Sequence, residues 1–137
     1  MLTRTATGLN AMVDIMKAAG ESSRLRILLL LSRGDLTVSD LTDILAQSQP
    51  RVSRHLKLLL EAQLIERYQE GSWAYFRLSD DEAARDFLAS IIDRVDASDP
   101  MVERDLERLG AVKRKRQDHA AAYFSANAAS WDEIRSL

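Results

Sequence analysis

Apolar residues recur along most of the chain at helical spacing, which predicts a mainly α-helical protein. The first apolar stripe consists of four residues that share one helical face: Leu9, Met12, Val13 and Met16. Gly20 is expected to end this helix. The next segment, ESSRLRILLLLSRG, is apolar on most of its circumference, so it predicts a buried helix that stops at Gly34.

Residues 37–62 predict two short helices joined by a tight turn. Thr37 is a good N-cap for the first helix, and Asp40 stands three residues later, where it can complete a capping box. Ser48 can cap the second helix, whose first turn accommodates Pro50 because a backbone N–H would have no intrahelical partner there. Two short helices separated by about three residues form a helix-turn-helix.

The pattern changes after this pair of helices. The alternating segment LIERYQEGSWAYFRL, with Gly71 in its middle, predicts a β-hairpin. From Ser79 onward helical spacing returns, with an apolar stripe from Phe87 to Val95, and Asp99-Pro100 ends that helix. The predicted fold class is therefore mainly α with a small β-hairpin, a winged helix-turn-helix. Both apolar stripes exceed what a three-helix core would cover, so we expect helical dimerisation elements at both ends.

Composition narrows the classes of function. The 137 residues carry a net charge of −2 and contain no cysteine, which excludes disulfides, thiolate metal sites and cysteine nucleophiles from these residues. Residues 1–20 lack the basic start and long apolar core of a signal peptide. The longest apolar run, Ile27 to Leu31, is far shorter than the ~20 residues of a membrane helix. We therefore expect a cytoplasmic protein with no membrane partner.

Basic side chains cluster on the second helix of the helix-turn-helix despite the negative total. The cluster consists of Arg51, Arg54, His55 and Lys57. A helix that enters the major groove needs an apolar side that holds it on the domain and a cationic side that meets bases and phosphates. Arg67 and Arg77, near the base of the hairpin, are candidates for phosphate contacts. This order predicts a homodimer that binds double-stranded DNA, with an ordinary amphipathic helix and hairpin as the alternative.

The same stretch resembles a known family. The segment from Ser22 to Asp80, and above all SQPRVSRHLKLL and EGSWAYFRL, resembles the recognition helix and wing of the ArsR/SmtB family of winged-helix repressors. The resemblance covers about residues 9–95. It implies a transcriptional repressor with DNA-facing positions at Ser48, Gln49, Arg51, Ser53, Arg54, His55 and Lys57. Residues 1–97 are then the DNA-binding and dimerisation domain, and residues 98–137 a charged helical linker or C-terminal extension.

Two departures from the family pattern are informative. Gln63 stands where the family commonly has glycine, so either it adopts a left-handed backbone at a cost of about 1 kcal/mol or the helix ends differently. Members that sense arsenic, cadmium or lead carry paired cysteines where this chain has Val38 and Ser39, and soft metals need thiolate. His55 and His119 are the only histidines. We expect no metal site and no cofactor in these residues.

The C-terminal segment KRKRQDHAAAYFSANAASWDEIRSL resembles the stretch that opens a SAM-dependent methyltransferase domain in proteins that fuse it to an ArsR-like head. A methyltransferase domain needs a glycine-rich loop, and the glycines of this chain are scattered, so these residues contain no methyltransferase. An effector is therefore expected to bind outside them. The sequence shows no paired carboxylates at a motif spacing and no catalytic partner for His119, so we do not expect an enzyme. The alternative function is a winged-helix protein-interaction module that does not read DNA.

Overall fold

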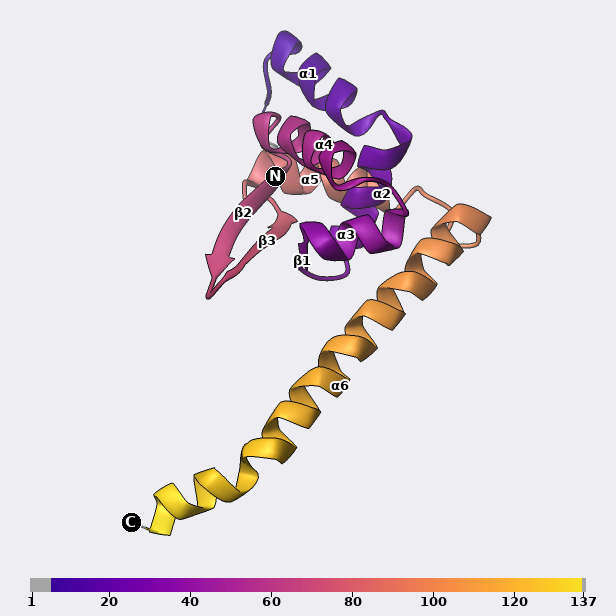
Figure 1. The fold of residues 1–137 in the computed structure, drawn as a ribbon. Helices are drawn as coiled ribbons and strands as arrows, with labels where there is room; N and C mark the ends of the chain where they lie inside the picture. Colours follow the sequence, from indigo (N-terminus) through magenta and orange to yellow (C-terminus); the bar gives the residue numbers. More distant parts are fainter. Residues whose placement is uncertain (1–5, 137) are drawn as a thin grey trace.

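The computed structural model describes the backbone of residues 6–136 and the side-chain surroundings of residues 6–122. A body of five helices carries a small antiparallel sheet, and a sixth, long helix leaves that body (Figure 1). The helices are α1 Leu9–Ala19, α2 Ser22–Leu31, α3 Val38–Leu45, α4 Gln49–Glu61, α5 Glu82–Ile92 and α6 Pro100–Ser136. The strands are β1 Leu36–Thr37, β2 Ile65–Glu70 and β3 Trp73–Leu78. The predicted fold class is confirmed.

Local capping explains where the helices begin. The Thr37 hydroxyl accepts a hydrogen bond from the Asp40 backbone N–H at 3.1 Å, and the Asp40 carboxylate accepts one from the Thr37 N–H at 2.9 Å. This is the expected capping box of α3. The Ser48 side chain caps α4 through the Arg51 N–H, and Glu21 caps α2 through the Arg24 N–H. The predicted starts of α3 and α4 are therefore confirmed, but α5, expected from Ser79, begins at Glu82 with Asp81 as its cap and ends at Ile92, before Asp99-Pro100.

Two non-glycine residues adopt the left-handed backbone conformation beside the helices of the helix-turn-helix. Gln63 has φ 59°, so of the two expected alternatives it is the left-handed backbone that this residue adopts. Ala46, at the end of α3, has φ 54°, which the sequence did not predict. Each conformation costs about 1–2 kcal/mol in an L-residue. The contacts of α4 with α3 and with β2 offset these costs.

The core lies around α2, as its apolar circumference predicted. Ile27, Leu28 and Leu30 are almost completely buried, and they pack with residues of α3, α4 and the sheet. The apolar stripe of α1 behaves differently, because Leu9 is 81% exposed and Met16 is 58% exposed. Only the end of α1 is buried in the body.

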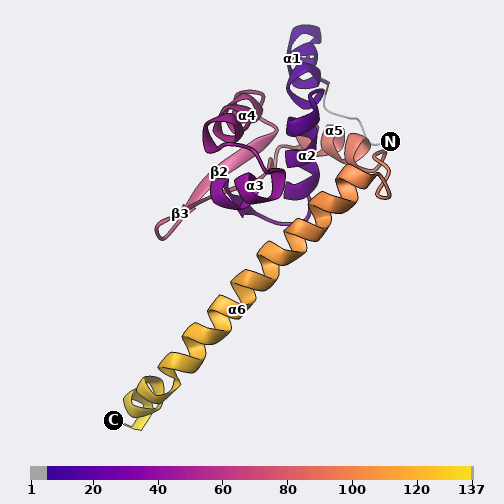
Figure 2. The same cartoon turned by 45° about the vertical axis from the view of Figure 1, so that its right-hand side comes forward.

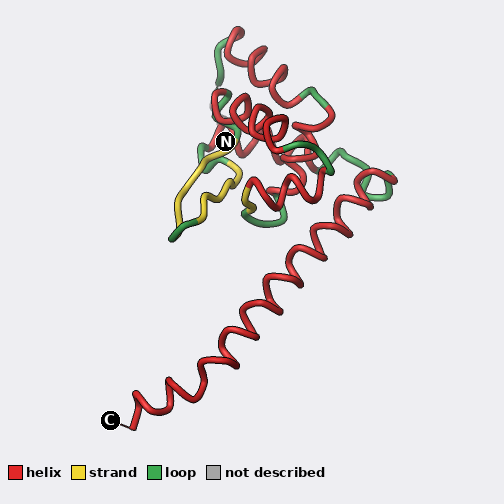
Figure 3. Tube along the Cα trace, in the orientation of Figure 1, coloured by secondary structure: helices red, strands yellow, loops and turns green. Residues whose placement is uncertain are grey.

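The hairpin of β2 and β3 projects from the helices as a wing (Figure 3). Strand order is β1-β3-β2, and both pairs are antiparallel. The two-residue strand β1 pairs Leu36 with Phe76 and was not predicted, because it is too short to show alternation. In the β2–β3 pair, Tyr68 lies opposite Tyr75, and their rings stack with centroids 5.5 Å apart.

Tyr68 is tied to the loop before β1 by its hydroxyl, which donates to Asp35 at 2.6 Å. This hydrogen bond raises the pKa of Tyr68 from 10.0 to about 12. The bond therefore stabilises the fold fully below pH 10 and is lost as the pH rises through about 12. We expect Asp35→Ala to move this ionisation towards pH 10 in an absorbance titration of tyrosinate, with Tyr68→Phe assigning the signal. Ionisation of Tyr68 near pH 10 in the unaltered protein would contradict this assignment.

The beginning of α6 packs on the body although the sequence predicts a charged linker there. Leu109 is 4% exposed, Asp105 forms a buried ion pair with Arg26, and the Arg108 guanidinium donates to the Ile44 carbonyl at 2.9 Å. Lys113 and Arg116 still contact the body, and beyond them the helix runs away from it (Figures 1 and 2). The division into residues 1–97 and 98–137 remains a prediction, but the first turns of α6 contribute to the core.

The expected packing of the apolar tail residues Tyr123, Phe124, Trp131 and Ile134 lies outside the described side chains. Between residues 6 and 136, even the longest helix is too polar to cross a membrane.

Candidate nucleic-acid interface

Helix α4 has one buried apolar side and one exposed polar side, as a helix that enters the major groove requires. Val52, Leu56 and Leu59 are buried and hold the helix against α2 and α3. The other side carries the predicted DNA-facing residues that are exposed: Ser48, Gln49, Arg51, Ser53, Arg54 and Lys57. Six of the seven positions predicted in and just before α4 are therefore exposed, and we call them together the α4 face.

The electrostatics of the α4 face favour an anionic partner. Among residues 6–122, no carboxylate lies within 4.0 Å of the cationic groups of Arg51, Arg54 or Lys57. These side chains are therefore available for an external anion. Arg51 and Arg54 stand in the first half of the helix, where the N-terminal end of the helix dipole adds positive potential.

His55 differs from the expectation, because its imidazole lies beside α2. Its side chain is 14% exposed, its Nδ1 lies 3.2 Å from the Arg24 guanidinium, and it lies 3.8 Å from Glu21. The reason is helical geometry, since residue 55 borders the buried stripe of Val52 and Leu56. Burial, followed by nearby Arg24, lowers the pKa of His55 against the opposing effect of Glu21. His55 therefore helps to fix α4 on the body.

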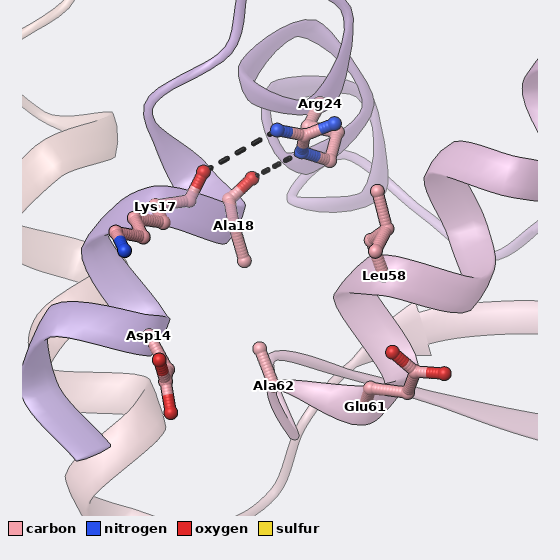
Figure 4. Close-up of a pocket in the computed structure, with 7 residues that line it drawn as sticks. All are labelled: Asp14, Lys17, Ala18, Arg24, Leu58, Glu61 and Ala62. Atoms are coloured by element: carbon pink, nitrogen blue, oxygen red, sulfur yellow. Dashed lines mark hydrogen bonds between the residues drawn. The ribbon is translucent and has the colours of Figure 1, made fainter. Parts of the chain in front are cut away.

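Arg24 is a positioning residue that the sequence reading missed. Its guanidinium donates to the Ala18 carbonyl at 2.6 Å and to the Lys17 carbonyl at 3.3 Å, so it binds the C-terminal end of α1 (Figure 4). The same group lies 3.2 Å from His55 of α4, and Arg24 also lines a hollow of about 330 Å³ between α1 and α4. The available signal was an arginine within a largely apolar helix, which also contains Arg26, and its partner His55 is 31 positions away in sequence.

The wing supplies two arginines with different surroundings. Arg67 is exposed, and Arg77 donates to Glu66 at 3.1 Å while its guanidinium lies 5.2 Å from the centre of the Tyr68 ring. Hydrogen bonds from the Asp80 backbone and from Arg77 lower the pKa of Glu66. Arg77 must therefore give up or share a neighbouring carboxylate to contact phosphate, whereas Arg67 has no such competitor among the described residues.

Comparison with known proteins identifies a family and several relatives. The model of the family "Bacterial regulatory protein, arsR family" matches residues 21–67, which include α2, the helix-turn-helix and the start of the wing. The chain is 44% identical over 82 residues to the arsenical resistance operon repressor of Escherichia coli, covering 59% of this chain and 68% of that protein. It is 34% identical over 108 residues to the arsenic resistance transcriptional regulator ArsR1 of Pseudomonas putida, covering 78% and 84%.

Solved structures share the fold. One is the homodimeric winged helix-turn-helix DNA-binding domain of a possible ArsR-family regulator from Mycobacterium bovis. It has a TM-score of 0.56 at 28% identity, covering 61% of this chain and 76% of that one. HlyU from Vibrio cholerae has a TM-score of 0.54 at 28% identity, covering 60% and 88%. The chain belongs to the ArsR family of bacterial regulatory proteins, and it is a winged helix-turn-helix, DNA-binding transcriptional repressor of the ArsR type.

Proposed function

We propose that the chain represses transcription in the cytoplasm as a homodimer that reads DNA with the α4 face. The observation that carries this proposal is the pair of exposed cations Arg51 and Arg54 in the first half of a capped helix, neither of which has a carboxylate within 4.0 Å among residues 6–122. Gln49, Arg51 and Arg54 are assigned to base edges, because amide and guanidinium groups form bidentate contacts with adenine and guanine. Lys57 and Arg67 are assigned to phosphate, and Arg77 joins them once Glu66 is displaced.

Dimerisation is proposed through α1 and α5. Leu9, Val13 and Met16 leave an apolar strip on α1 that is 39–81% exposed, and this surface is unfavourable in water. On α5, Phe87 and Ile91 are half-buried. The Mycobacterium bovis neighbour is described as homodimeric. Two copies would place their α4 helices at half-sites about 34–36 Å apart, or a multiple of that spacing.

A charge placed on the α1 strip is expected to separate the dimer. Met16→Glu puts a carboxylate into a surface that becomes apolar and dry in the dimer, which is strongly unfavourable. We expect wild-type protein to sediment as a dimer at micromolar concentration and Met16→Glu to sediment as a monomer. Ala11→Glu is the matched control, because Ala11 is exposed on the opposite side of α1. Equal sedimentation of all three proteins would contradict the assignment.

DNA reading is tested by selection of duplexes from a random pool. We expect enrichment of a two-fold symmetric sequence that binds roughly 10³ times or more tightly than random DNA. A protein-interaction module would enrich no sequence. Measured affinity should fall steeply with salt, because each neutralised phosphate releases counterions.

The effector of this chain must differ chemically from arsenite held by thiolates. Relatives named for arsenic resistance match the chain, yet residues 1–137 contain no cysteine. Soft thiophilic ligands need thiolate donors, so residues 1–137 provide no thiolate site of that kind. We propose that DNA binding by this chain is insensitive to arsenite.

The resemblance of the C-terminal segment to the start of a methyltransferase domain supports a link to S-adenosylmethionine or S-adenosylhomocysteine through a further domain. The test titrates a longer natural form and the 137-residue chain with both nucleosides while DNA binding is measured. We expect a response in the longer form only. A response of the 137-residue chain would contradict this placement.

A further inference from the structure

A second site is built where α3, the wing and α6 meet, on the opposite side of α3 from its packing with the core. A cleft of about 680 Å³ opens there, a volume typical of small-molecule sites. Its floor includes the aromatic rings of Trp73 and Tyr75 from β3. Its two polar walls are α3 and the segment of α6 from Val112 to Ala120, and these two helices contact each other.

The walls are fixed by groups that are already partnered. Arg116 of α6 forms an ion pair with Asp40 of α3, and its guanidinium lies 5.6 Å from the centre of the Tyr75 ring. One turn earlier, the Lys113 ammonium donates to the Arg33 carbonyl at 2.8 Å. These contacts join α6, α3 and the wing, and they set the width of the cleft without a ligand.

Other polar groups of the cleft have no such partners. Among residues 6–122, Asp43 on the α3 wall and Lys115 and His119 on the α6 wall make no side-chain hydrogen bond or ion pair. The two walls therefore offer opposite chemistry, an acceptor on α3 and cationic or donor groups on α6. Trp73, which also lines the cleft, is 58% exposed, so its ring is open to a ligand.

We propose that this cleft is an effector site for a small planar aromatic molecule with an anionic group at one end and N–H donors at the other. The ring stacks on Trp73, the anionic group meets Lys115 and His119, and the N–H donors meet Asp43. Opposed polar walls over an aromatic floor favour this class over purely aliphatic or singly charged ligands, since either would leave one wall unpaired.

The position of the cleft couples it to DNA binding, and this part rests on the proposed function. Helix α3 is the first helix of the helix-turn-helix, and β3 is half of the wing. A ligand that engages Trp73 holds the wing towards α6 and away from flanking DNA. Such differential binding typically changes affinity 5- to 150-fold. We expect the ligand to weaken DNA binding within that range.

Ligand binding is tested first without DNA, on the full chain. The probe is 6-amino-2-naphthoate, followed by its own fluorescence anisotropy, with 2-naphthoate lacking the amine and 6-amino-2-naphthamide lacking the anion. We expect the probe to bind most tightly. Lys115→Gln should weaken the two naphthoates by about tenfold but not the amide, because it removes a charge-assisted contact. Asp43→Asn should weaken the two amines but not 2-naphthoate.

Matched controls separate the cleft from general effects of charge. Arg114→Gln changes the neighbouring cation on α6, and Asp86→Asn changes an exposed acid on α5; neither residue lines the cleft. Both controls should bind the probe as the wild type does. Trp73→Leu should abolish binding of all three compounds while the circular dichroism of the protein is unchanged. Equal binding of the three compounds, or equal effects of Lys115→Gln and Arg114→Gln, would overturn the proposed site.

The second step adds the selected duplex. If the protein binds that duplex but the probe neither binds the protein nor weakens the complex, the cleft proposal fails while the proposed function stands. If the probe binds with the expected dependence on Lys115 and Asp43 but no duplex is selected, the proposed function fails and the ligand site stands.

Discussion

Replacing Arg26 with methionine is expected to lower the free energy of unfolding by about 3–5 kcal/mol. The Arg26 guanidinium and the Asp105 carboxylate form two parallel hydrogen bonds of 2.8 and 2.9 Å, with side chains only 11% and 5% exposed. The hydrogen bond to Asp105 raises the pKa of Arg26. Without the guanidinium, Asp105 is left buried and charged, so the substitution destabilises α6 on α2. Denaturant unfolding measures the loss, and amide exchange locates it in α6.

The double variant Arg26→Met with Asp105→Leu is the decisive control. Replacing both members of a buried pair with apolar residues of similar size is often neutral, so the double variant should recover most of the lost stability. Arg85→Met, whose partner Asp80 is exposed, should change stability by no more than about 1 kcal/mol. A loss below about 1 kcal/mol for Arg26→Met would show that the pair does not hold α6 in place.

Arg54→Ala is expected to weaken the selected duplex by about 2–6 kcal/mol per dimer, because each of two copies loses a base contact worth about 1–3 kcal/mol. That range corresponds to at least roughly 25-fold in affinity. Binding to random duplexes should fall much less, since only a charge is lost there. Competition titrations at one fixed salt concentration measure both losses.

Arg67→Ala is the matched comparison for Arg54→Ala. Its guanidinium is exposed on the wing and is assigned to phosphate, so its removal should weaken selected and random duplexes to the same extent. It should also make the salt dependence shallower. Identical effects of the two substitutions on both duplexes would remove the distinction between base reading on α4 and backbone contact on the wing.

Features determined by neighbouring residues could be predicted from the sequence. The capping box of Thr37 and Asp40, the Ser48 cap and the turn at Gly71 each depend on groups within four residues. The exposure of the α4 cations could also be predicted, because the apolar stripe of the same helix shows which side is buried. The family resemblance added the order of elements, which periodicity alone could not specify.

Contacts between distant parts of the chain could not be predicted in this way. Arg26 and Asp105 are separated by 79 positions, so neither residue alone indicates that α6 begins inside the core. That the His55 imidazole lies beside Arg24 could not be predicted either, because the two residues are 31 positions apart. The cleft between α3, the wing and α6 combines three segments that share no local pattern.

Repeating the duplex selection with Arg54→Ala shows whether the α4 face reads bases. If the α4 face reads bases in a symmetric dimer, the variant loses its preference at one base position in each half-site, at positions related by the two-fold axis. The preferences elsewhere should be retained, because the other contacts are unchanged. An enriched sequence identical to that of the wild-type protein would contradict the account, since DNA would then be read by a different surface.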